Sequence, residues 1–297
     1  MSYQQQVPPQ SYYQQQPPQG YYTPDQSYPY AQQGYAQQPP PVVYVQQPPE
    51  QRSNNDDCIT ACIASLCVLK HCPPPTYDTG CTHCSPPPES LATLKSVPED
   101  VSRTFPPLNR LVVHASGLHD YNEWPRKVEA LPTMAKLQKL GRGNGNMIVM
   151  SSLPGNDLLL WPDAQRVKID LTNDDTIKSF FTAINKDETV DGLPGITVSS
   201  IDKPVILICA HKQRDNRCGV IGTMIHDEFE RVLENENIDA HLGIVSHVGG
   251  HVYAGNVAVL KPDGTSVWYG LVRPSHVQGI VSATVVGNTV IEELCRQ

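Results

Sequence analysis

The chain has 297 residues and a formal net charge of −8 at pH 7, from 22 lysines and arginines against 30 aspartates and glutamates. This acidic balance, without a basic block, argues against nucleic acid as the main partner. Its nine cysteines, an odd number spread over unlike motifs, argue against the disulfide framework of a secreted protein and favour an intracellular one.

Residues 1–55 have the composition of a disordered tail. Up to residue 50 the chain consists almost wholly of Gln, Pro, Tyr, Gly and Ser, and its first basic residue is Arg52. Such a segment cannot bury enough apolar surface to fold, so we expect a flexible tail, with weak self-association through tyrosine and glutamine as the alternative. The tail also lacks the features of a secretory signal and of an arginine-rich mitochondrial transit peptide.

Residues 56–76 form a cysteine-rich segment. Its apolar stretch is about a dozen residues long, short of the roughly twenty that a membrane-spanning helix needs. The tail followed by Asp56-Asp57-Cys58 resembles the amino end of cysteine-rich transmembrane module proteins, but after Leu69 a lysine, a histidine and three prolines interrupt the expected run. The segment is interpreted as a palmitoylated anchor for peripheral membrane association, as a metal site, or as a junction of two coding units. The first two would use four thiols: Cys58, Cys62, Cys67 and Cys72.

A CxxC motif follows, with Cys81 and Cys84 placed just before a run of prolines. In a reducing compartment this spacing indicates auxiliary redox chemistry or metal binding more often than a structural disulfide. A thioredoxin-type active site would follow a strand and open a helix, so the proline-rich loop argues against one.

Residues 77–200 read as a first α/β region. Strands are expected at 111–114, 147–150 and 167–171, with one helix over 127–140, interrupted by Pro132, and a second helix capped by Asn173 or Asp174 and running through Ile184. The region carries no phosphate-binding glycine loop, no Ser/His/Asp ordering and no dinucleotide fingerprint. It also lacks the paired carboxylates that glycoside cleavage generally needs.

Residues 201–297 read as a second α/β domain. Pro204 to Cys209 is a continuous apolar run, typical of a central strand covered on both faces. From Asp215 the apolar residues recur at helical spacing, which places Cys218 at the first turn, where free amides and the helix dipole stabilise a thiolate. Strands follow on both sides of a loop at 247–251, and residues 261–264 have the composition of a hairpin turn. This order is typical of a thioredoxin-like α/β sandwich.

Two cysteines and two histidines in this domain form a candidate ligand set for a transition metal or an iron–sulfur cluster: Cys209, Cys218, His247 and His251. Eight residues separate the cysteines, three separate the histidines and 28 lie between the two pairs, which does not fit a zinc finger. The histidine pair also lacks the glutamate of metalloproteases. Next to the first cysteine, we expect an exposed basic loop that docks an acidic redox partner or is simply solvated: His211, Lys212, Arg214 and Arg217.

The spacing of the two cysteines, together with His-Val-Gly-Gly-His-x-Tyr-Ala-Gly-Asn, residues 266–274 and His276-Val277, resembles the sucrase/ferredoxin-like family. The resemblance extends from Cys81 to the end and includes residues 124–129. It implies a carboxyl-terminal thioredoxin-like ferredoxin domain with a non-Rieske [2Fe-2S] cluster bound by two cysteines and two histidines, here Cys209, Cys218, His247 and His251. It also implies a mitochondrial location, with a cytoplasmic or membrane-associated one as the alternative.

Three functions follow from these patterns. The first is electron transfer or redox regulation with an unknown redox partner protein, rather than hydrolysis. In that case two thiolates balance the charge of the oxidised cluster, so histidine ligation raises the reduction potential, and a free imidazole nitrogen couples reduction to protonation. The second is a zinc-binding or dithiol protein with the same residues. The third is a membrane-associated stress adaptor driven by the tail.

Overall fold

The computed structural model describes residues 67–87, 100–141 and 143–297, all within the compact unit Ser53–Gln297. The expected tail and the cysteines Cys58 and Cys62 lie outside the described residues. None of the described helices combines the length and the apolar composition needed to cross a membrane.

The first half of the described chain is built on apolar strands and two helices. The strands are β2 (Arg110–Ala115), β3 (Asn146–Ser151), β4 (Asp157–Trp161), β5 (Gln165–Ile169) and β6 (Ile196–Ser200), and the helices are α2 (Pro132–Gly141) and α3 (Asp174–Asn185). The expected strands at 111–114 and 147–150 are confirmed, and the third lies slightly earlier than predicted. β4 and β6 were not predicted.

Proline and asparagine set the starts of these helices. The helix expected over 127–140 instead begins at Pro132 after a 3-10 turn, Val128–Ala130, because proline fits the first turn of a helix but not its interior. Asn173 caps α3, as one of the two predicted caps, and its side chain accepts from the backbone N–H groups of Asp175 and Thr176.

The second half confirms the expected order of elements. Its strands are β7 (Val205–Cys209), β8 (His241–Val245), β9 (Val257–Leu260) and β10 (Ser266–Tyr269), and its helices are α4 (Asn216–Asn235) and α5 (Val277–Ile280), which continues as a π-helix, Val281–Val286. All five residues of β7 are buried, as the apolar run predicts. The predicted turn joins β9 to β10, where the backbone N–H of Gly264 donates to the carbonyl of Lys261.

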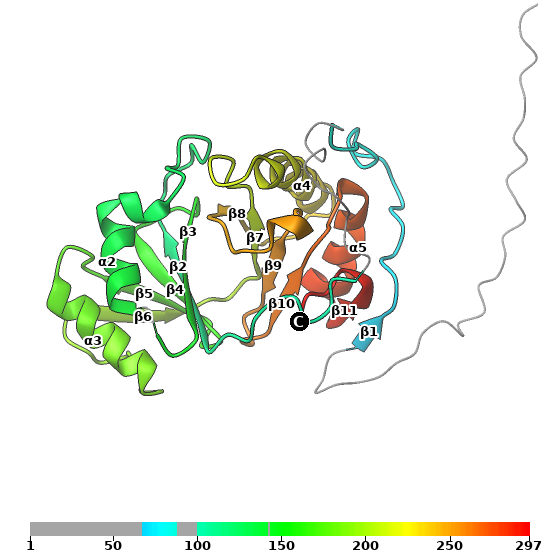
Figure 1. The fold of residues 1–297 in the computed structure, drawn as a ribbon. Helices are drawn as coiled ribbons and strands as arrows, with labels where there is room; N and C mark the ends of the chain where they lie inside the picture. Colours follow the sequence, from blue (N-terminus) through cyan, green and yellow to red (C-terminus); the bar gives the residue numbers. More distant parts are fainter. Residues whose placement is uncertain (1–66, 88–99, 142) are drawn as a thin grey trace, which may run out of the picture. The chain divides into compact units, whose positions relative to one another are not determined.

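Both halves share one strand topology within a nine-stranded sheet ordered β10-β9-β7-β8-β3-β2-β4-β5-β6. In each, the first strand pairs in parallel with the second and antiparallel with the third, and the fourth pairs antiparallel with the third. The halves meet where β3 and β8 pair at Ser151 and Val245. Helices α2 and α3 lie on one side of the strands, and α4 and α5 on the other (Figure 1). The mixed α/β fold and the thioredoxin-like second half are therefore as predicted, while a domain boundary at residue 200 stays a prediction.

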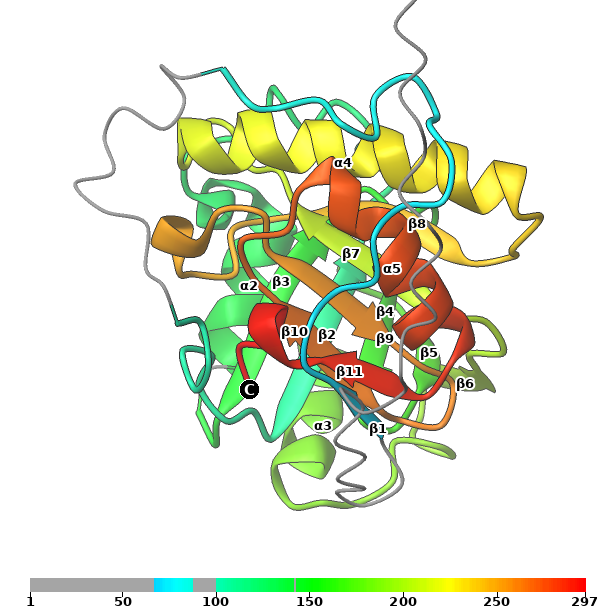
Figure 2. The same cartoon turned by 90° about the vertical axis from the view of Figure 1, so that its right-hand side faces the viewer.

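Residues 67–87 form a strap along the second half (Figure 2). Its strand β1 (Cys67–Leu69) pairs in parallel with β11 (Thr289–Ile291), and the backbone N–H of Cys72 donates to Glu293 at 2.7 Å. Farther on, the hydroxyls of Thr79 and Thr82 donate to the buried Glu228 of α4, at 2.5 and 2.8 Å. The described part of the cysteine-rich segment is thus held on the folded unit.

Candidate metal centre

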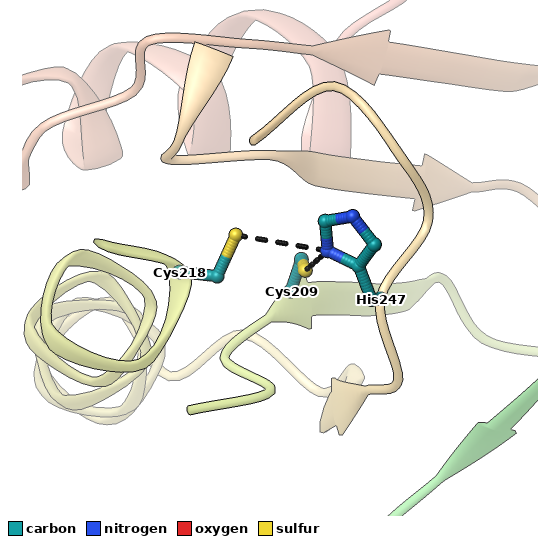
Figure 3. Close-up of side chains that lie close together, drawn as sticks. All are labelled: Cys209, Cys218 and His247. Atoms are coloured by element: carbon teal, nitrogen blue, oxygen red, sulfur yellow. Dashed lines mark hydrogen bonds between the residues drawn. The ribbon is translucent and has the colours of Figure 1, made fainter. Parts of the chain in front are cut away.

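Three of the four expected ligands converge at one edge of the sheet. Cys209 ends β7, Cys218 lies in the first turn of α4, and His247 follows β8 (Figure 3). The Nδ1 atom of His247 is 3.9 Å from each of the two sulfurs, and the three donor atoms lie within 4.8 Å of one another. Both cysteines are fully buried and the histidine is half-buried. Within the part of the chain that the structure describes, this is the one such group of metal-ligating side chains.

Two glycines let α4 begin close to the end of β7. A Cβ atom at Gly222 would lie 2.3 Å from the carbonyl oxygen of Cys209, and one at Gly219 would lie 2.4 Å from Cβ of Lys212. Glycine within a helix costs about 0.5–1 kcal/mol relative to alanine, and here that cost permits the close approach. Asp215 caps the helix by accepting from the backbone N–H of Arg217. The two cysteine sulfurs therefore face each other across a short gap.

The two thiols differ in their pKa. A hydrogen bond from the Cys218 thiol, with further contributions from His247 and the backbone N–H of Val248, holds the pKa of Cys209 below its usual value. The same hydrogen bond and burial raise the pKa of Cys218. Cys209 is thus the first of the pair to become a thiolate, and a bound metal would displace the proton that remains.

The fourth expected ligand, His251, lies beside this group. Its ring centroid is 5.8 Å from that of His247, its side chain is 49% exposed, and its Nδ1 is 3.9 Å from a carboxylate oxygen of Asp215. It belongs to a 3-10 turn that follows Gly249 and Gly250, both with positive φ, a conformation that glycine adopts without strain. The structure therefore places the second histidine next to the three-residue group and not within it.

His211 is the main correction to the sequence analysis. An exposed loop role was expected, but the side chain is 1% exposed. Its Nε2–H donates to the carbonyl of Pro125 at 3.0 Å, and its Nδ1 accepts from the backbone N–H of His247 at 3.3 Å. Trp124 packs edge-on against the ring, and burial lowers the pKa of His211. A neutral imidazole thus connects the first half of the chain to a candidate ligand.

The rest of the expected basic loop is divided. Arg217 forms a bidentate ion pair with the carboxylate of Asp215, with nitrogen–oxygen distances of 2.9 and 2.7 Å, and is therefore not available to a partner protein. Lys212 and Arg214 are exposed. The charges are evident in the sequence, but no local pattern shows which of them is neutralised within the fold.

Arg296, which the sequence did not single out, supports the histidine loop. It is 2% exposed and donates to Oδ1 of Asn256 at 2.6 Å and to the carbonyl of Thr104 at 3.0 Å. Its guanidinium lies 4.9 Å from the ring centroid of Tyr253, and a Cβ atom at Gly250 would be 2.4 Å from one of its nitrogens. Residues 250–253 therefore pack against a buried arginine.

The other cysteines are placed apart from this group. Cys81 and Cys84 are joined in a disulfide, so metal binding by this pair would require its reduction, and its redox role stays a prediction. Cys67 is exposed, whereas Cys72 is half-buried and its thiol donates to the carbonyl of His276 at 3.5 Å. Lipidation or metal binding in the cysteine-rich segment also stays a prediction.

The donor set fits a soft metal centre. Thiolates and imidazoles suit zinc and iron–sulfur clusters. With metal–sulfur and metal–nitrogen distances of about 2.3 and 2.1 Å, a sulfur and a nitrogen on one tetrahedral ion lie about 3.6 Å apart. The observed 3.9 Å is close to that value, and the nearby His251 is a candidate fourth donor for a larger group.

Comparisons with known proteins give a consistent result. Residues 101–297 match the family model described as sucrase/ferredoxin-like, and residues 42–68 match the one described as cysteine-rich TM module stress tolerance. The chain is 33% identical over 259 residues to altered inheritance of mitochondria protein 32 of Clavispora lusitaniae, covering 77% of this chain and 94% of that protein. The protein of the same name from Debaryomyces hansenii is 32% identical over 64% of this chain and 82% of its own length. Actin patches distal protein 1 of Saccharomyces cerevisiae is 26% identical over 51% and 57% of the two chains. No solved structure matches.

Proposed function

The chain belongs to the sucrase/ferredoxin-like family, and from that premise we propose that it is an iron–sulfur protein acting in electron transfer or redox regulation. Its [2Fe-2S] cluster is held by two cysteines and two histidines: Cys209, Cys218, His247 and His251. The observation that carries the proposal is the convergence of two buried sulfurs and an imidazole nitrogen within 4.8 Å, from three different elements. Thiolates and imidazole at this separation form a donor set that suits zinc or an iron–sulfur cluster.

The ligand set determines what the centre can do. When bound, the cluster supplies one-electron chemistry, and ligation by only two thiolates raises its reduction potential relative to a four-cysteine site. Burial of Cys209 and Cys218 keeps water from the sulfurs, while the half-exposed His251 lies at the surface, where electrons and protons can be exchanged. An imidazole that binds through one nitrogen keeps the other for a proton, so reduction is coupled to protonation near neutral pH.

The test is the iron and acid-labile sulfide content of the full chain purified without oxygen, together with its visible and EPR spectra. The proposal requires two irons and two sulfides per chain. The Cys209→Ala and Cys218→Ala variants should lose both, whereas the Cys67→Ser variant, altered at an exposed cysteine of the strap, should retain them. A colourless, iron-free protein that still folds after reconstitution would overturn the proposal.

Replacement of the histidines tests the electronic argument. His247→Cys and His251→Cys should each keep a cluster but lower its reduction potential, because the added thiolate brings negative charge. A potential unchanged in both variants would contradict histidine ligation. A wild-type potential that does not move between about pH 6 and 9 would contradict the coupling to protonation.

A zinc-binding protein with the same residues is the second candidate. The sulfur–nitrogen distances of 3.9 Å favour it, because they are close to those around a single tetrahedral ion. One zinc per chain, without colour and with no iron after reconstitution, would identify this alternative.

A mitochondrial location is supported by the names of the relatives, altered inheritance of mitochondria protein 32. Membrane association through the amino-terminal segment is supported by the match at residues 42–68. Mitochondrial location and membrane association are distinguished by fractionating cells that express either the full chain or a chain lacking residues 1–66. The deletion ends there because residues 67–87 pack on the folded unit. Recruitment lost with the deletion would support the adaptor role.

A further inference from the structure

A cavity of about 210 Å³ adjoins the candidate metal centre. It lies where the segments after β7 and β8 meet the first half of the chain, outside the carboxyl ends of two parallel strands, a place where α/β proteins commonly bind ligands. His247 lines this cavity, together with residues of both halves that include Arg126, Lys127, Arg214 and Ser246. The cavity thus reaches the candidate centre from the side of the first half.

The lining of the cavity is cationic. Arg126, Lys127 and Arg214 bring three positive charges, against one carboxylate, Glu129. In the ranges 67–87, 100–141 and 143–297, no carboxylate lies within ion-pair distance of any of the three cations, in contrast to the neighbouring Arg217, which is fully paired with Asp215. All three cations are exposed, and the apolar Val128 and Ile148 beside them are buried. Three unpaired cations around one cavity form a field that attracts an anion.

Ser246 adds a neutral donor. It is 2% exposed, and its hydroxyl oxygen accepts from the backbone N–H of Met150 at 3.0 Å. Among the described residues, no acceptor takes the hydrogen of this hydroxyl. A buried hydroxyl with an unused donor gains by meeting an oxygen atom of a ligand.

We propose that this cavity is a binding site for a small multivalent oxyanion, held by Arg126, Lys127 and Arg214 with Ser246 as a neutral donor. Its volume of about 210 Å³ suits a phosphate or a short dicarboxylate. The guanidinium groups match both oxyanions because they offer paired N–H donors in a plane.

Anion binding at this site does not require the metal, but its effect on the reduction potential rests on the proposed function. His247 lines the cavity and is also a candidate ligand, so a bound anion places negative charge beside the centre. Negative charge disfavours the addition of an electron. Occupancy should therefore lower the reduction potential of a cluster, and an oxyanion would act as an effector of the redox site.

The experiment is isothermal titration calorimetry of the full chain with inorganic phosphate and, separately, with succinate, at fixed ionic strength. One of the two should saturate with a Kd of about 1 mM or tighter, and the better ligand identifies the class. The variants Arg126→Gln and Arg214→Gln should weaken binding at least about tenfold, since each removes one charge-assisted contact. The matched control is Lys212→Gln, which removes an exposed charge near Arg214 but outside the cavity lining, and should change the Kd less than about twofold.

Three results would overturn the proposal. The first is the absence of saturation by either anion below about 10 mM. The second is an equal loss of affinity in Lys212→Gln and Arg214→Gln, which would indicate general attraction to a basic surface. The third is tight binding of an acidic peptide without binding of either small anion, which would assign the cations to a partner protein. If binding is found but the potential does not shift with it, the anion site stands and the redox consequence fails.

Discussion

The backbone N–H of His247 donates a hydrogen bond to Nδ1 of the buried His211 at 3.3 Å. Because the Nε2–H of the same ring is committed to the carbonyl of Pro125, the imidazole is neutral and its tautomer is set. His211 thereby holds the candidate ligand His247 in place through its backbone. His211 itself lies two positions after Cys209, another candidate ligand.

Replacement of His211 should loosen the centre. His211→Ala removes the partner of the half-buried N–H of His247 and of the carbonyl of Pro125, so the free energy of unfolding should fall by about 1–3 kcal/mol and metal should be released faster to a chelator. His211→Asn can still place an oxygen near the position of Nδ1, and should recover most of the metal retention. Urea unfolding and chelator competition measure the two effects. Equal release rates in the Asn and Ala variants would contradict the positioning role.

Stability should fall in mild acid because of buried histidines. Burial lowers the pKa of His114 below the 6.5 of a free histidine, and its Nδ1 has no hydrogen-bond partner in the described residues. The unfolded chain therefore takes up this proton at a higher pH than the folded chain, so the stabilisation is present above pH 6.5 and is lost as the pH falls toward the lower folded value.

The His114→Phe variant tests this assignment. It removes the titrating group from the core, so its free energy of unfolding should depend less on pH between about 7.5 and 5 than that of the wild type. Denaturant titrations of the metal-free chain at several pH values give the difference. Parallel pH profiles for the two proteins would assign the acid sensitivity to other groups, such as the half-buried His276, whose pKa is also lowered.

Replacement of Arg296 by lysine should destabilise the protein. Lysine keeps the charge but cannot reproduce the planar fork that bonds Asn256 and Thr104 while lying over Tyr253, so we expect a loss of about 2–4 kcal/mol in the free energy of unfolding. Amide exchange at residues 250–253 should rise as well. The control is Arg231→Lys at a half-exposed arginine, which should stay within about 0.5 kcal/mol. Unchanged exchange in the loop would show that Arg296 supports only the amino-terminal residues it contacts.

The two described cysteines of the strap should differ in reactivity. Burial and the nearby Glu293 raise the pKa of Cys72 to about 12, so that almost none of this thiol is ionised near neutral pH. In the native protein, iodoacetamide should modify the exposed Cys67 faster than Cys72, and urea should remove the difference. Mass spectrometry after timed quenching measures both rates. Faster modification of Cys72 in the native chain would show that the strap detaches readily from the folded unit, as lipidation of Cys72 requires.

Local sequence determined the elements that carry the candidate ligands. The run from Val205 to Cys209 is apolar throughout, so it forms a strand buried on both faces, and Asp215 caps the following helix because its carboxylate reaches a free amide. The types of the candidate ligands could also be read from the sequence, through the cysteine and histidine spacing and the family resemblance. The strand and the helix cap depend on neighbours within a few residues, which is the range over which periodicity and capping act.

Tertiary structure alone decided what surrounds those ligands. His211 is buried because Trp124 and Pro125, some 86 residues earlier, lie against it. Arg296 reaches the histidine loop from the far end of the chain, and Arg126 meets Arg214 across one cavity only because β3 and β8 bring the two halves together. The burial, pairing and charge of a side chain depend on contacts between residues distant in sequence, which no local pattern records.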